Sequence, residues 1–145
     1  MINIHEAKFE EAVNSRGERW RSLDLSGEHI GVRIEDLSPG DSSSVHHYHT
    51  LEEEHVLALE GTATLILGSR ELPIRAGDHV WFAAGDEQAH HIENRSAQNF
   101  KFLVFGERRD GDVVFYPERG VMLVKARGNR QFKYEERAKP KKDEA

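Results

Sequence analysis

Short apolar segments separated by polar turns follow one another along most of the chain, from residue 23 onward. The segments are rich in Val, Ile, Leu and Phe, and none of them carries a convincing helical period. In order, they read HIGVRIEDL, HVLALEGTATLIL, DHVWFAA, AHHIEN, NFKFLVFG and GVMLVKA. Many short strands at close spacing predict an all-β fold, either an antiparallel barrel or a sandwich.

The polar separators are strong turn signals because they concentrate Gly, Pro, Asp and Ser. They include SPGDSS (38–43), GSRELP (68–73), AAGDEQ (83–88) and RRDGD (108–112). Each apolar segment is too short to hide its own face. Closure into a small barrel would bury the inward residues and remove most exposed sheet edges, so we expect a closed barrel whose mouth can admit a ligand.

The two ends of the chain differ from this central part. Residues 1–22 have weak periodicity, and Phe9, Ala12 and Val13 indicate at most a short helical turn. The segment 125–142 carries eight basic and two acidic residues, which is typical of a solvated tail. We therefore expect an N-terminal arm (1–22), one barrel domain (23–124) and a polar, basic C-terminal tail (125–145) that is mobile from about Gly128.

Composition narrows the possible classes of function. A length of 145 residues suits a single domain, and a net charge of −6 argues against nucleic-acid and membrane partners. The chain has neither a signal-peptide-like apolar run at its start nor eighteen consecutive apolar residues, so we expect a cytoplasmic protein. It contains no cysteine, so any transition metal would be held by histidine nitrogen and carboxylate oxygen.

Such ligands are concentrated in the stretch VHHYHTLEEEHVLALEG (45–61). Residues two apart on a strand share a face, so His47 and His49 would point together, and Glu54 on a returning strand could join them. A fourth ligand could come from His90 or His91, of which only one can face the interior, and the local sequence does not say which. The alternative is a solvated polar loop, since histidines are common on edge strands.

The stretch resembles the first motif of the cupin family. That motif reads Gly, five residues, His-x-His, three or four residues, Glu, six residues, Gly. Gly40, His47, His49, Glu54 and Gly61 match it, with one extra residue between Gly40 and His47.

The second cupin motif reads Gly, five residues, Pro-x-Gly, two residues, His, three residues, Asn. Gly77, Gly85, His90 and Asn94 match it in order, although Ala83 stands at the proline position and two extra residues precede His90. The resemblance covers about residues 23–124. It implies a single-domain double-stranded β-helix, also called a jelly-roll barrel, in which His47, His49, Glu54 and His90 bind one divalent metal ion, and it leaves His91 outside the ligand set.

Three imidazoles and one carboxylate suit Fe, Mn, Ni, Co, Cu or Zn, and the ligand types alone do not choose among them. The resembled family contains oxygenases, isomerases and lyases as well as proteins that only bind or sense a ligand. Two hypotheses follow: a mononuclear metalloenzyme acting on a small organic molecule by oxygenase or isomerase/lyase chemistry, or a non-catalytic cupin that binds a small ligand through its metal. The sequence assigns no general acid or base, although Tyr48, Glu52, Glu53 and His55 are near the ligands.

A homodimer is also expected. Single-domain cupins commonly pair, and residues 1–22 are long enough to reach across a neighbouring sheet.

Overall fold

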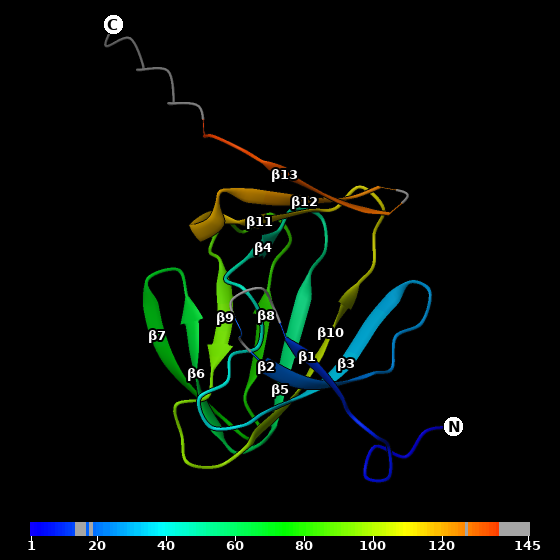
Figure 1. The fold of residues 1–145 in the computed structure, drawn as a ribbon, viewed down its shortest axis with the longest axis vertical. Helices are drawn as coiled ribbons and strands as arrows, with labels where there is room; N and C mark the ends of the chain where they lie inside the picture. Colours follow the sequence, from blue (N-terminus) through cyan, green and yellow to red (C-terminus); the bar gives the residue numbers. More distant parts are fainter. Residues whose placement is uncertain (14–16, 18, 127, 137–145) are drawn as a thin grey trace, which may run out of the picture.

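Antiparallel strands dominate the fold, as the pattern of apolar segments predicts (Figure 1). The computed structural model describes residues 1–13, 17, 19–126 and 128–136. The helical content of these residues is one 3-10 turn, η1 (Pro117–Arg119). No helix in this described part is long and apolar enough to cross a membrane. The all-β fold class is therefore confirmed.

The largest sheet has six strands in the order β1-β2-β3-β10-β5-β8. Strand β10 lies near its middle and pairs with β3 along one edge and with β5 along the other. Because these long pairings join segments far apart in the sequence, they hold the body of the fold together. The strands are β1 (Glu10–Val13), β2 (Arg19–Asp24), β3 (Ile30–Leu37), β10 (Phe100–Glu107), β5 (Glu54–Glu60) and β8 (His79–Phe82).

Two smaller sheets complete the fold. The three-stranded sheet has the order β7-β6-β9, and the four-stranded sheet, at the top of Figure 1, has the order β13-β12-β11-β4. Their strands are β7 (Arg70–Arg75), β6 (Thr62–Leu67), β9 (His90–Glu93), β13 (Asn129–Lys133), β12 (Val121–Lys125), β11 (Val113–Tyr116) and β4 (Tyr48–His49).

The three sheets form a jelly-roll sandwich, and the expectation of one closed barrel is wrong in this respect. Strand β4 has two residues and β9 has four, so these strands form too few backbone hydrogen bonds to continue the strand pairing around the molecule. Single bridges take the place of a ladder there, at Ser42 with Glu93 and at His47 with His90. The second bridge brings together two of the residues expected to bind metal.

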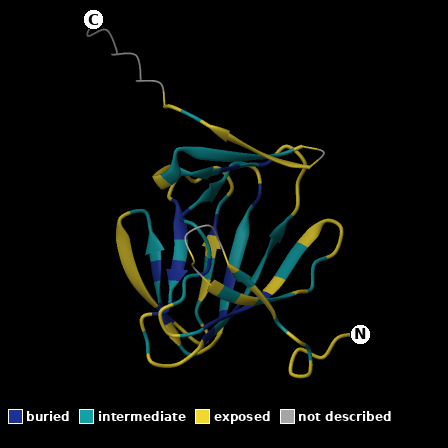
Figure 2. Ribbon diagram, viewed as in Figure 1, coloured by how far each residue is buried: buried dark blue, intermediate teal, exposed yellow. Residues whose placement is uncertain are grey.

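One hydrophobic core lies between the six-stranded and three-stranded sheets. Val56 and Ala58 alternate with more exposed residues along β5, as Phe100 and Phe102 do along β10. In Figure 2 the buried segments, in dark blue, lie mainly inside the body of the fold. The full cluster is Leu37, Val56, Ala58, Ala63, Leu65, Ile74, Phe82, Ile92, Phe100 and Phe102.

Regular structure also lies outside the central segment 23–124. The helical turn expected near Ala12 is instead strand β1, in which Ala12 pairs with Trp20 of β2. Strand β13 pairs with β12 along its whole length. The boundaries of arm, domain and tail stay predictions, and residues 14–16, 18, 127 and 137–145, on which parts of them depend, lie outside the described residues.

Candidate metal centre

The four residues expected to bind metal come from three separate parts of the chain. His49 ends β4, and His47 lies two residues before it on the same face. Glu54 begins β5 and His90 begins β9. The fold brings these strand ends to one place because the backbone of His47 bridges to that of His90.

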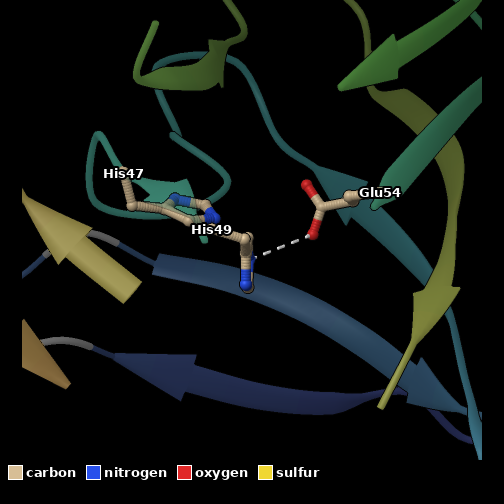
Figure 3. A group of neighbouring side chains, drawn as sticks. All are labelled: His47, His49 and Glu54. Carbon is tan, nitrogen blue, oxygen red and sulfur yellow. Dashed lines mark ion pairs between the residues drawn. The ribbon is translucent and has the colours of Figure 1, made fainter. Parts of the chain in front are cut away.

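Ligand atoms of His47, His49 and Glu54 all lie within 4.8 Å of one another (Figure 3). Nε2 of His49 is 3.8 Å from Oε2 of Glu54. His90 adjoins this group, since its Nε2 is 2.9 Å from Oε1 of Glu54 and its ring centroid is 4.7 Å from that of His47. The structure therefore brings all four residues together, with the Glu54 carboxylate between two imidazoles.

Hydrogen bonds orient two of the imidazoles. Nδ1 of His47 lies 2.7 Å from the carbonyl oxygen of Val45, and Nδ1 of His49 lies 2.7 Å from Oδ2 of Asp112. A neutral imidazole that donates from Nδ1 has an unprotonated Nε2, which is the form that binds a metal ion. The network thus favours the tautomer in which both Nε2 atoms carry free electron pairs.

The charge states at the centre also suit a cation. Burial is the main reason that the pKa of His47 falls to about 3, so its ring is neutral near pH 7. Burial opposes ionisation of Glu54, but the hydrogen bond from His90 and the nearby imidazoles outweigh it and lower the pKa of this carboxyl to about 2. Glu54 is therefore an anion close to the neutral ring of His47.

His90 and His91 face different surroundings. The His90 ring is buried and stacks on Phe82, with ring centroids 3.5 Å apart, and its Nδ1 has no hydrogen-bond partner among the described residues. His91 contacts Glu93 at 2.9 Å and Nδ1 of His46 at 2.8 Å, away from Glu54. The nitrogen of His90 that faces Glu54 is Nε2, so Nε2 is the atom through which this ring would join His47, His49 and Glu54 at an ion. The donor set present thus fits one divalent metal.

Asp112 adjoins the centre, although no sequence pattern indicates it. It is fully buried, and its Oδ1 accepts hydrogen bonds from the backbone N–H groups of Thr50, Leu51 and Glu52, which fix the loop between β4 and β5. Burial opposes its ionisation, but the hydrogen bonds from His49 and from Leu51 keep its pKa far below the ordinary value. In the sequence it is one acid of the turn RRDGD, and nothing local distinguishes it from its neighbours.

A second group of ligand-type atoms, from His49, Glu52 and Asp112, also lies within 4.8 Å. Nζ of Lys125 is 2.6 Å from Oε2 of Glu52 and 3.7 Å from Oδ2 of Asp112. The backbone N–H of Arg109 donates to Oε1 of Glu52 at 2.7 Å. Because the Lys125 ammonium lies against both carboxylates and backbone N–H groups donate to them, this group is an ion-pair network that supports the loop.

The other residues near the ligands have different contacts. Tyr48 stacks on Phe115 with ring centroids 5.1 Å apart, and His55 stacks on Phe105 at 4.9 Å. Glu53 accepts a hydrogen bond from the exposed Trp81 at 3.3 Å. These contacts hold Tyr48 and His55 against aromatic rings, whereas the partly exposed Glu53 also lines the cavity next to the centre.

A cavity of about 1130 Å³ adjoins the centre and is lined by His47, His49, Glu54 and His90. Its wall also includes Phe102 and Val104 of β10 and the acidic side chain of Glu35 on β3. A cavity of this size can admit a small organic molecule beside the four ligands.

Comparison with known proteins identifies the kind of domain. The profile of the Cupin domain family matches residues 33–106. Among curated proteins, none matches the chain. Many solved structures do match.

Two of these structures resemble nearly the whole chain. One is a putative sugar phosphate isomerase from Acidithiobacillus ferrooxidans. It is 30% identical with a TM-score of 0.82, and the match covers 89% of this chain and 86% of that chain. A sugar phosphate isomerase of the cupin superfamily from Silicibacter pomeroyi is 27% identical with a TM-score of 0.80, covering 92% of each chain. A third structure is a predicted oxalate decarboxylase from Thermotoga maritima. It is 24% identical with a TM-score of 0.65, and the match covers 75% of this chain and 99% of that chain. At this identity the similarity shows the fold alone.

Proposed function

The chain belongs to the cupin family, and we propose that it is a metal-dependent enzyme that isomerises a small hydroxylated carbonyl compound. In this proposal His47, His49, Glu54 and His90 hold one divalent transition metal ion. The observation that carries it is the convergence of three imidazoles and one ionised carboxylate at the wall of a cavity.

When bound, the ion would act as a Lewis acid that polarises a carbonyl or hydroxyl oxygen of the substrate. The protein residues supply orientation and charge. Asp112 holds the His49 ring with Nε2 facing Glu54, and Glu54 keeps a negative charge that retains the cation. The stacked Phe82 ring fixes the plane of His90.

Sugar phosphates are the first substrate class to test. Two relatives that bear the name sugar phosphate isomerase match about nine-tenths of this chain at 27% and 30% identity. Isomerisation needs neither dioxygen nor a second cofactor, whereas oxygenase chemistry needs a redox-active ion. Of the two kinds of chemistry expected from the sequence, the names of these relatives favour the isomerase kind over the oxygenase kind.

The test combines metal analysis with turnover. Protein stripped with a chelator and reloaded in turn with Fe²⁺, Mn²⁺, Ni²⁺, Co²⁺, Cu²⁺ or Zn²⁺ would be incubated with aldose and ketose phosphates, and interconversion followed by NMR. We expect one ion per chain and turnover that the stripped protein lacks. Oxygen uptake without interconversion would point to oxygenase chemistry, and tight ligand retention without turnover would point to the non-catalytic alternative.

A further inference from the structure

Glu35 is a buried carboxyl group in the cavity wall, on a strand that carries none of the four metal-binding candidates. It lies on β3, opposite Phe102 of β10 and opposite Ser22 of β2. Only 4% of the residue is exposed, and its side chain lines the same cavity as His47. Strand alternation places Asp36 on the other face of β3.

The contacts of Glu35 are too few for a structural carboxylate. Its Oε1 lies 3.5 Å from the guanidinium of Arg33, and its Oε2 is buried with no hydrogen-bond partner among the described residues. The neighbouring Asp36 shows the usual arrangement, since it accepts a hydrogen bond from Asn99 at 3.1 Å and pairs with Arg21 at 3.2 Å. A buried oxygen without a partner destabilises the fold, so a side chain that keeps one in a cavity wall is a candidate for chemistry.

The surroundings also adjust the acidity of Glu35. Burial is the largest influence and raises the pKa, the charge of Arg33 lowers it, and the charge of Glu54 raises it, with a net pKa of about 7. The residues directly opposite on β2 and β10, Ser22 and Phe102, are uncharged. Near neutral pH the group can therefore both accept and return a proton, which is the requirement for general acid–base catalysis.

We propose that Glu35 is the catalytic base and acid that moves a proton between adjacent carbons of an α-hydroxy carbonyl substrate, a sugar phosphate being the class tested. This role rests on the proposed isomerase function. It differs from the roles of His47, His49, Glu54 and His90, because Glu35 would act directly on substrate carbon.

The step balances without an oxidant. The Glu35 carboxylate takes the proton from the carbon that bears the hydroxyl group, and the C–H electron pair forms the carbon–carbon double bond of an enediolate as the carbonyl π pair moves onto oxygen. Glu35, now a carboxylic acid, returns the proton to the former carbonyl carbon. The proton of the original hydroxyl passes to the other oxygen, the new carbonyl forms, and Glu35 is again a carboxylate.

The experiment is solvent exchange in D₂O with the metal-loaded full chain. Glucose 6-phosphate, ribose 5-phosphate and mannose 6-phosphate serve as probes, and proton NMR follows the loss of the C2 proton signal. We expect exchange with at least one probe, and Glu35→Gln should slow it about 100-fold or more with unchanged metal content. Asp36→Asn is the matched control, a buried carboxyl on the opposite face of β3, and should retain the exchange rate.

The outcomes separate the two proposals. If the wild type and Glu35→Gln exchange the C2 proton at the same rate, the role of Glu35 is overturned and the isomerase function stays in place. Neither exchange nor interconversion with any probe would overturn the isomerase function and this role with it. If Glu35→Gln does not fold, Glu35→Asp takes its place, and an unchanged exchange rate with the shortened side chain would overturn the role.

A second readout does not depend on activity. Infrared spectra of the metal-free protein should show a protonated carboxylic acid band near pH 6 that is lost by pH 8 and is absent from Glu35→Gln. A difference spectrum without this band would show that Glu35 is already ionised at pH 6, which overturns its capacity to return a proton near neutral pH.

Discussion

Replacement of Glu35 by glutamine should stabilise the metal-free protein at high pH. The unfolded chain ionises Glu35 near its ordinary pKa of 4.5, whereas the folded protein holds the proton until about pH 7, mainly because the group is buried. Between these values the folded state binds more protons than the unfolded state, so the free energy of unfolding falls as the pH rises. The stability linked to this proton is fully present below pH 4.5 and is lost by about pH 7.

The magnitude follows from the two pKa values. At about 1.36 kcal/mol per pKa unit, the change from 4.5 to about 7 corresponds to about 3 kcal/mol. This energy needs little correction for solvent screening, because only 4% of Glu35 is exposed. Glutamine has a similar shape and no charge, so the free energy of unfolding of Glu35→Gln should lack this part of the pH dependence.

Urea denaturation of both proteins from pH 4 to 8, with a chelator present, measures the effect. Other groups titrate in this range, and the pKa of His47, lowered to about 3, acts with the opposite sign. The difference between variant and wild type cancels these groups and isolates Glu35. We expect it to grow by about 3 kcal/mol in favour of the variant between pH 4 and 7.5, and growth below about 1 kcal/mol would refute the reasoning.

Four further predictions concern the metal and the assembly. His90→Ala should lose bound metal while His91→Ala retains it, and elemental analysis giving the reverse would refute the choice between the two rings. Metal affinity, measured by equilibrium dialysis, should fall as the pH drops through about 6.5, where protons compete for free imidazoles, and a pH-independent affinity would contradict imidazole ligation. Asp112→Asn should weaken metal binding about 10- to 100-fold in a chelator competition, whereas Asp110→Asn in the same turn, which is exposed, should not. Light scattering should give a dimer, and a mass near 16.6 kDa at micromolar concentration would contradict this.

The sequence predicted the elements whose pattern is local. Alternating apolar residues located β5, β8 and β10, and the spacing of His47 and His49 placed both rings on one face. The edge strands β1 and β13 were missed because they contain few apolar residues and depend on pairing with β2 and β12. The expectation of a closed barrel was wrong because the apolar pattern of a single segment does not tell how many backbone hydrogen bonds join one sheet to the next.

Glu35 and Asp112 could not be found in this way for a different reason. Glu35 is one of two adjacent acids in HIGVRIEDL, and only the pairing of β3 with β10 decides that it faces the cavity while Asp36 faces away. Asp112 is 63 residues from His49 in the chain, and the contact exists because β11 pairs with β4. The chemistry of both residues is a property of strand pairing rather than of local sequence.

The position of His90 shows why an irregular motif can still yield a regular site. Two extra residues precede His90 in the second cupin motif, and a shift of one position would exchange the inward ring for His91. The register of β9 does not depend on that loop, because β9 pairs with β6 through Leu67 opposite His90, and the backbone of His90 bridges to His47. The added length is therefore confined to residues 86–89, which lie outside any strand. Pairing on both sides fixes which histidine meets Glu54, so insertions in this loop should leave the centre intact while changes in β6 should not.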